Sequence, residues 1–498
     1  MAKKKPDWER FGRASKAEAP EITELNAWRK NPRSFDVASY YCQALIHRAH
    51  VVMLTERGII GVEEARTLIP GIRKVEKMAA DDPSLVGYMS TETALIKLIG
   101  EGGGRMHIGR SRNDLGHTQR RMYFRDQEER LAGSLIHFQE KLLAKAEENA
   151  ETLMPGYTHM RQAQPATLGH YLLAHVDAAD RSLGRVEDAY RRTNLSPLGS
   201  AAFAGTGWPV DRTRTKELLG FDGLLENSTD AVASIDYVME FASAIAIHLS
   251  SVSRLAEDLQ VWSDDEHGMI DLDEAYAGTS SIMPQKKNPL ILEYLKGYAS
   301  ESIGNLVSVV VSVKGSAYTN MVDRILLEPV AIDTAVGATN VIAGLVASMT
   351  PVSEAMERNL REGFSTTTDL ADALVRLHKI GFRQAHDTVV DVVLKAISQG
   401  KKVSEVTPDM VADSSLNVVG RRLEIGPEDL RAAVDPAENL RRKTSIGGPA
   451  PDEVRRMIAE RRSRLADTKR RREGRLGKLR AAYEKLAEVE RGLGVPVG

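Results

Sequence analysis

A short polar segment, Arg110-Ser111-Arg112-Asn113, precedes a long helical pattern that begins near Asp114. Asn113 or Asp114 could cap that helix, and the two arginines would then lie beside its positive N-terminal end. Such a concentration of hydrogen-bond donors suits a carboxylate or a phosphate. The alternative is a plain helix cap with solvated arginines, and the segment alone leaves both interpretations open.

A second polar segment, Gly156–Pro165, leads into another long helical pattern. Thr158 and His159 provide a hydroxyl and an imidazole, and an imidazole can transfer protons near neutral pH. A purely structural threonine–histidine pair is the competing interpretation.

A third segment, Gly278–Pro289, begins with a glycine and two hydroxyl side chains, Ser280 and Ser281, and ends with Lys286 and Asn288. Spacing alone is compatible with a mobile linker. However, the apolar residues in the middle of the segment would anchor it, and that arrangement favours a lid that closes over a site.

Long helical patterns flank all three segments. The clearest one, Thr229–His267, contains neither proline nor glycine and carries apolar residues at helical spacing. As one helix it would be on the order of 50 Å long, and its apolar stripe must be buried in a bundle. The ranges 114–150, 164–193 and 289–314 show the same pattern. Strand signals are sparse, and the β-branched run at 309–313 continues a helical pattern.

Shorter helices are expected elsewhere, broken at residues such as Gly58, Pro70 and Pro83 in the first part of the chain. The sequence therefore predicts an all-α fold built from several helical units. The boundaries are an N-terminal domain with a polar arm at 1–113, a central long-helix domain at 114–363, a small C-terminal domain at 364–453 and a charged helical extension at 454–498.

Composition limits the possible functions. The chain has 498 residues, a net charge of −2 and 42% hydrophobic residues, which is ordinary for a folded soluble protein without a general attraction for nucleic acid. A single cysteine, Cys42, fits a reducing compartment. No signal peptide and no uninterrupted apolar run of about 18 residues is present, so we expect a cytoplasmic protein without membrane contact.

The segment 454–490 is rich in arginine and could be a nucleic-acid patch. Its opposite charges recur at helical spacing, however, and Tyr483 is its one aromatic residue. We therefore favour an amphipathic helix that is solvated or packs against another subunit, and we expect no nucleic-acid partner.

The segment Ser280–Asn288 resembles the signature Gly-Ser-Ser-x-Met-Pro-x-Lys-x-Asn of the fumarase/aspartase superfamily. The two other polar segments and Ser196-Pro197-Leu198-Gly199 are similar to conserved blocks of the argininosuccinate lyase family. The resemblance covers roughly residues 36–450. It implies three helical domains, a homotetramer whose central helices form a 20-helix core, and active sites that are each built from three subunits.

The resemblance also implies a reaction, an anti elimination that releases fumarate from a small-molecule N-succinyl amine without a metal or cofactor. Ser280 would remove the Cβ proton, and Lys286 would stabilise the resulting negative charge. Thr158 and His159 would act at the amine side, with Glu293 orienting the histidine. The implied substrate-binding residues are Asp36, Arg110, Ser111, Arg112, Asn113, Thr158, Gln162, Ser281, Met283, Lys286, Asn288 and Asn320.

Several positions differ from the family pattern. Thr279 replaces a glycine, Ile235-Asp236-Tyr237 replaces an Arg-Asp-Phe stretch, and Asn320–Ile325 replaces a Tyr-x-Lys-Asp-x-Gln stretch. Leu85–Tyr88 replaces an acidic cluster. Losing polar partners from a guanidinium pocket costs recognition, so we expect an altered amine half, as in an aminopolycarboxylate such as ethylenediamine-N,N′-disuccinate. The alternatives are argininosuccinate as substrate, or an inactive structural relative.

Overall fold

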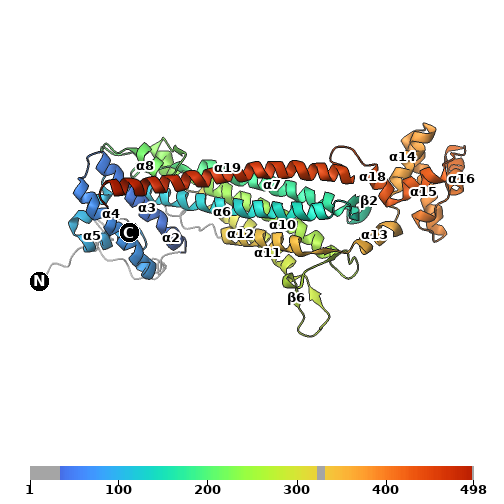
Figure 1. Ribbon diagram of the computed structural model, residues 1–498, viewed down its shortest axis with the longest axis horizontal. Coiled ribbons are helices and arrows are strands. Elements are labelled where there is room, and N and C mark those ends of the chain that lie inside the picture. The colour runs from blue at the N-terminus through green and yellow to red at the C-terminus, as the bar shows by residue number, and fades with distance from the viewer. Residues whose placement is uncertain (1–33, 322–330, 496–498) are drawn as a thin grey trace.

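The computed structural model describes residues 34–321 and 331–495 and is an elongated helical rod (Figure 1). A globular helical unit lies at each end, and long helices join them. The predicted N-terminal arm at 1–34 falls almost entirely outside the described residues, as does most of the stretch 320–325. The rod is mostly helical, as the sequence predicts.

The N-terminal unit contains short helices around an apolar core that includes Ile46, Leu68 and Leu95. Pro70 lies inside a helix and does not end it, so the predicted break at that residue is wrong. Buried side chains on both sides of Pro70 hold the helix in place. The elements are α2 (Ser34–Ala38), α3 (Tyr40–Glu56), α4 (Val62–Asp81), η3 (Pro83–Leu85), α5 (Tyr88–Ile99) and η4 (Glu101–His107).

The central unit contains the longest helices, with α6 packed against α7 and α12, and α10 packed against α11 and α7. The predicted single helix at 229–267 is wrong, because the chain breaks at Ser234 and Ile235 and the second helix ends at Trp262. The Ser234 hydroxyl accepts a hydrogen bond from buried Arg121, which holds the break. The helices are α6 (Arg112–Glu148), α7 (Leu168–Thr193), α8 (Arg212–Leu218), α9 (Ser228–Ala233), α10 (Asp236–Trp262), α11 (Leu290–Lys314), α12 (Ala331–Ser348) and α13 (Ser353–Glu362).

Short strands connect these helices. The largest pair is an antiparallel hairpin of β1 (Leu153–Thr158) and β2 (Arg161–Thr167), which contains the second polar segment. The sequence analysis did not predict this hairpin. The remaining pairs are β3 (Leu195–Ser196) with β4 (Gly223–Leu224), β5 (Ile270–Asp271) with β8 (Thr350–Pro351), and β6 (Gly278–Thr279) with β7 (Lys287–Asn288). The short helix η5 (Glu274–Tyr276) lies between β5 and β6.

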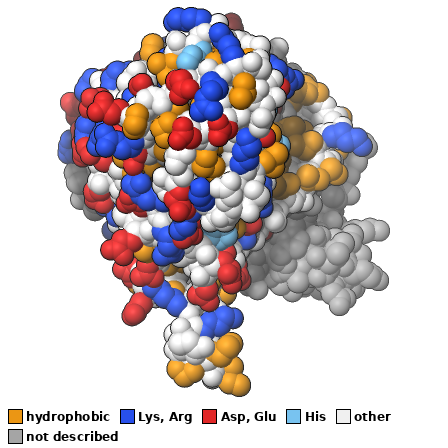
Figure 2. All heavy atoms as spheres, turned by 90° about the vertical axis from the view of Figure 1, so that its right-hand side faces the viewer, with side chains coloured by type: hydrophobic (Ala, Val, Ile, Leu, Met, Phe, Trp, Pro, Cys, Tyr) orange, Lys and Arg blue, Asp and Glu red, His pale blue; other side chains and the backbone are white. Residues whose placement is uncertain are grey.

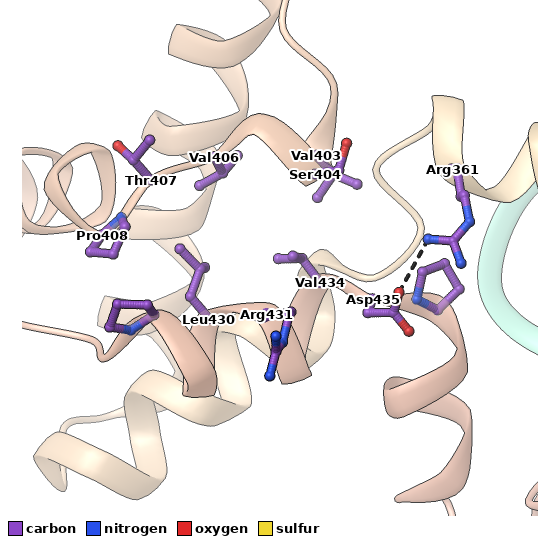
Figure 3. Close-up of a pocket in the computed structure, with 12 residues that line it drawn as sticks. Arg361, Val403, Ser404, Val406, Thr407, Pro408, Leu430, Arg431, Val434 and Asp435 are labelled. Carbon is purple, nitrogen blue, oxygen red and sulfur yellow. Dashed lines mark hydrogen bonds and ion pairs between the residues drawn. The ribbon is translucent and has the colours of Figure 1, made fainter.

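The C-terminal unit has its own apolar core. A cavity of about 330 Å³ lies between α13, η6 and α17, and the ion pair of Arg361 with Asp435 forms one side of it (Figure 3). The elements are α14 (Thr367–His378), α15 (Phe382–Ser398), η6 (Val403–Glu405), α16 (Pro408–Val419), α17 (Pro427–Val434) and α18 (Pro436–Arg441).

The charged tail forms α19 (Pro451–Gly492), a helix that runs back along the rod to the N-terminal unit (Figure 1). Its arginines form ion pairs with acidic residues of its own chain; Arg475, for example, contacts both Glu129 and Glu187. Near its end, fully buried Glu490 accepts hydrogen bonds from Arg48 at 2.7 and 2.8 Å. The predicted helix is therefore confirmed, and its packing partner in this structure is its own subunit.

Helix α12 is the one described helix that is long and apolar enough to cross a membrane. Half of that segment is buried within the protein, against α6, α10 and α11. A core helix of a soluble bundle meets the same criteria of length and composition.

Candidate active site

The first polar segment forms the beginning of α6. Ser111, rather than Asn113 or Asp114, is the N-cap: its hydroxyl accepts from the Asn113 N–H at 3.3 Å. The Asp114 carboxylate accepts from the Ser111 N–H at 2.9 Å and completes a capping box. Arg112 is exposed, while Ser111 and Asn113 are half-buried. This end of α6 therefore presents donors toward solvent beside a positive helix terminus.

Asp114 also connects α6 to the loop that contains Gly199 and Ala201. Its other oxygen accepts from the backbone N–H groups of Gly199 and Ala201 at 2.9 and 3.0 Å. Burial raises the pKa of this carboxyl, and the N–H groups that it accepts from oppose the rise. The Ser196–Gly199 motif is thus held against the first segment.

The chain enters this segment through a tight turn. Gly109 has φ +74°, and a Cβ there would lie 2.8 Å from Cγ1 of Val210, so glycine is required both by conformation and by space. The His50 Nε2 donates to the Ile108 carbonyl at 2.8 Å. Arg110 is only 6% exposed, and its Nη2 donates to the Nδ1 of His47 at 2.5 Å. Arg110 therefore lies behind the exposed donors.

Asn320, predicted from the family resemblance, lies beside Asn113. Its amide donates to the Asn113 side-chain oxygen at 2.9 Å, and its own oxygen lies 3.2 Å from the Nε2 of His117. Asn113 in turn donates to the Ala202 carbonyl at 2.9 Å. These contacts fix the orientation of the Asn113 amide and leave its second hydrogen for a ligand. Asp36 lies on α2 and is half-buried.

The second polar segment forms the tip of the β1–β2 hairpin. His159 and Met160 occupy the two turn positions with φ +53° and +57°, the pattern of a type I′ turn. Positive φ is uncommon for residues other than glycine and indicates a constrained position. Thr158, His159 and Gln162 are all exposed. The turn therefore presents an imidazole and a hydroxyl at the outer end of the central unit.

The third polar segment forms a loop between β6 and β7. The Ser280 hydroxyl accepts from the N–H groups of Ile282 and Met283 at 3.3 and 3.0 Å. Figure 2 shows this loop projecting below the body of the molecule with hydrophobic side chains at its tip, where Ile282 is 82% exposed. Thr279 pairs with Lys287 in the short sheet and has no positive φ, so its backbone does not require the family glycine.

The base of this loop lines a cavity of about 650 Å³. Met283, Lys286 and Asn288 form one wall of the cavity, and the end of α10 forms the other, with polar residues such as Gln260 and Ser263. Glu293 is exposed in the first turn of α11, and Ser281 is exposed in the loop itself. The second half of the loop thus lines a polar hollow.

The first segment lies far from the other two within one chain. Helix α6 has 37 residues and so separates Arg112 from the β1–β2 hairpin by ~55 Å. From Glu293 to the end of α11 at Lys314 the helix rises by ~32 Å, and Asn320 lies beyond that end. One described chain brings Asn320 to the first segment but does not bring the three segments together.

Sequence reasoning missed three histidines near the first segment, namely His47, His50 and His117. His47 and His50 are three residues apart on α3 and therefore share one helix face. That spacing was the available signal. It did not reveal that the shared face packs against the 108–111 turn.

Comparisons with known proteins identify the family of this chain. A family model described as a lyase matches residues 81–304, and one described as the argininosuccinate lyase C-terminal region matches residues 364–441. The argininosuccinate lyase of Methanocaldococcus jannaschii is 39% identical over 466 residues, which cover 92% of this chain and 95% of that protein. The enzyme of Methanococcoides burtonii is 40% identical over 437 residues, covering 85% of this chain and 87% of that enzyme.

Solved structures extend the comparison. EDDS lyase in complex with formate superposes with a TM-score of 0.90 at 41% identity, covering 98% of both chains. An EDDS lyase variant with bound fumarate gives a TM-score of 0.89 at the same identity and coverage. A class II fumarase from Schistosoma mansoni, at 17% identity and a TM-score of 0.70, covers 86% of this chain and 98% of its own and shares the fold.

Proposed function

Because this chain belongs to the argininosuccinate lyase family and is a carbon–nitrogen lyase that releases fumarate, we propose that it acts on an N-substituted aspartate with an altered amine half. The observation that carries this proposal is the loop around Ser280, in which two backbone N–H groups donate to the Ser280 hydroxyl and Lys286 and Asn288 line a polar cavity. A donor-rich helix end, such as the start of α6, suits the two carboxylates of the succinyl half.

In the proposed elimination, Ser280 removes the Cβ proton and the carbon–nitrogen bond then breaks. Serine is a poor base, so its deprotonated form must be stabilised. The Ile282 and Met283 N–H groups that donate to its oxygen favour the charged form, and closure of the loop would exclude water and bring Lys286 closer. Lys286 and Asn288 then stabilise the negative charge that grows on the adjacent carboxylate.

The succinyl carboxylates are proposed to bind Ser111, Arg112 and Asn113. Support comes from the oriented Asn113 amide, which keeps one hydrogen for a ligand, and from the exposed Arg112 beside the helix N-terminus. Ser281, Met283 and Gln162 would contact the rest of the substrate, and Arg110 would contribute its charge. Asp36 and Asn320 would lie near the bound molecule.

The amine side is assigned to Thr158 and His159. The strained turn that exposes the imidazole supports a role in proton transfer to the departing nitrogen. Glu293 would orient this imidazole. Glu293 lies in the first turn of α11 and His159 at the hairpin turn, and we propose that their contact is made between subunits.

Each active site is therefore proposed to draw on three subunits of a homotetramer. Exposed apolar side chains on α11 support such an assembly, because Tyr294 and Tyr298 on one face and Val307 and Val311 on another are 39–62% exposed on a helix of the central bundle. A 20-helix core formed by four copies would bury these side chains. The domain boundaries at 113, 363 and 453 and a cytoplasmic location remain predictions.

Two substrates have specific support. The similarity to EDDS lyase at 41% identity over 98% of both chains favours ethylenediamine-N,N′-disuccinate or a related aminopolycarboxylate. The similarity to argininosuccinate lyases at 39–40% identity favours argininosuccinate.

The test is to offer both compounds to the purified protein and to follow fumarate by its ultraviolet absorbance. We expect turnover of the aminopolycarboxylate to exceed that of argininosuccinate, and Ser280→Ala to reduce it by about 10³-fold. Efficient cleavage of argininosuccinate alone would favour the second candidate. Absence of fumarate release from either compound would contradict the proposed substrates.

A further inference from the structure

Helix α3 holds the turn that leads into α6 at two points. His50 donates to the backbone carbonyl of Ile108, and His47 accepts from the Arg110 side chain. Both imidazoles are at most 1% exposed. The turn behind the proposed carboxylate-binding residues is thus held from inside the N-terminal unit. His50 holds its backbone, and His47 holds the Arg110 side chain.

Arg110 is a buried cation with few partners. Its Nε and Nη1 atoms have no hydrogen-bond partner among the described residues, and in that part of the chain no carboxylate forms an ion pair with it. The His47 ring accepts from the Arg110 Nη2 at 2.5 Å, and Tyr88 is a second side-chain partner. Asp114 and Glu92 act on the Arg110 charge from nearby, but neither forms an ion pair with it among the described residues, so part of its field remains uncompensated.

The neutral form of His47 is the form that can accept this hydrogen bond. Burial lowers the pKa of His47 well below its usual range, and the nearby Arg110 charge lowers it further. The ring proton then resides on Nε2, which lies 3.3 Å from the side-chain nitrogen of Gln43. If the Gln43 amide is turned over, its oxygen faces His47 and accepts from this Nε2–H. His47 is therefore a permanent acceptor and not a second positive charge.

We propose that His47 is a positioning residue for fumarate binding: it holds the Arg110 guanidinium directly behind Ser111–Asn113, where that charge attracts the substrate carboxylates without touching them. The inference rests on the proposed function, since it requires a dianion at the start of α6. It assigns to the N-terminal unit an electrostatic role in addition to its packing role. Without the His47 acceptor, Arg110 would leave this orientation and the adjoining turn would lose its inner support.

The experiment measures the dissociation constant of fumarate by isothermal titration calorimetry for four full-length proteins. His47→Leu removes the acceptor, and His47→Asn keeps an acceptor oxygen close to the position of Nδ1. His248→Leu is the matched control: His248 is also 1% exposed and pairs with Thr339 at 2.8 Å, but it lies on α10 within the long-helix bundle. The unsubstituted protein completes the set.

We expect about a tenfold weaker fumarate affinity for His47→Leu, the usual range for losing a hydrogen bond to a charged group. His47→Asn should stay within about threefold of the unsubstituted protein, and His248→Leu should bind fumarate normally even if it unfolds more easily. In turnover assays, His47→Leu should raise KM more than it lowers kcat.

Other results would overturn the inference. Unchanged affinity in His47→Leu would show that Arg110 needs no such support, and equal weakening in His248→Leu would indicate a general loss of stability. Equal weakening in His47→Asn would likewise show that the acceptor is not what matters. If the unsubstituted protein itself bound no fumarate, the proposed function would fail together with the inference.

Discussion

The separation of the three polar segments leads to a prediction about mixed assemblies. Arg112→Ala damages the start of α6, and His159→Asn damages the hairpin tip while keeping a residue that tolerates positive φ. Each variant alone should be nearly inactive. If one active site takes its α6 end and its hairpin from different subunits, a site in a mixed tetramer can receive the intact copy of both.

The expected recovery follows from random assortment. At equal proportions, half of the α6 ends and half of the hairpins are intact, and the two choices are independent when they come from different subunits. About one quarter of the sites should therefore be intact, and activity should recover to about one quarter of the unsubstituted level. A distance of ~55 Å along α6 rules out a site in which one chain supplies both parts.

The assay co-expresses the two variants with different affinity tags, purifies protein that carries both tags and follows fumarate formation. A double variant, Arg112→Ala with His159→Asn, mixed with the Arg112→Ala chain, is the control and should recover little, because neither chain supplies an intact α6 end. Doubly tagged protein that remains as inactive as its parents would refute the reasoning, because subunit mixing would then be demonstrated without complementation.

Three further outcomes follow from single contacts. A Cβ at Gly363 would lie 2.8 Å from the Gln162 Oε1, so Gly363→Ala should displace that side chain and lower kcat/KM about tenfold while circular dichroism stays unchanged. Burial lowers the pKa of His248 to about 4, below its value in the unfolded chain. The unfolded chain therefore binds a proton that the folded chain does not, and the free energy of unfolding falls by ~3 kcal/mol as the pH falls from 6.5 to 4. In urea titrations, His248→Gln should not show this ~3 kcal/mol loss. In the same titrations, Glu490→Gln should lower the free energy of unfolding by ~3 kcal/mol, because Arg48 and Arg73 lose their buried counter-charge. Glu484 is exposed, and Glu484→Gln should lower it by less than ~0.5 kcal/mol.

Local patterns predicted most of the helical structure. The helix predicted from about residue 114 begins at Arg112 and ends at Glu148, and the one predicted at 289–314 spans Leu290–Lys314. Both are set by apolar periodicity and by capping groups, which are short-range properties. The break at Ser234 escaped this reasoning because its cause is buried Arg121, which is more than one hundred residues away in the sequence.

The β1–β2 hairpin could not be predicted from local sequence patterns. Both strands contain proline, a residue that argues against a strand interior. In the structure Pro155 and Pro165 face each other across the hairpin, and both are buried. A proline in a two-stranded hairpin can direct its missing donor away from the partner strand, so the usual penalty is reduced. The pairing of two prolines could not be inferred from either segment alone.

The polar segments themselves were found from their residue types, but their cooperation was not derivable from spacing. The first contains free backbone donors because it begins α6, and that long helix places it tens of ångströms from the hairpin. The long helix that provides a binding segment at its N-terminal end thus also separates that segment from the others. An antiparallel neighbour resolves this conflict, since the beginning of α6 in one copy then lies level with the end of α6 in the next. We therefore expect helix length, rather than loop sequence, to set which subunits share a site. An insertion of one full turn within α6 should disturb assembly of the site more than any substitution on the hairpin surface away from Thr158 and His159.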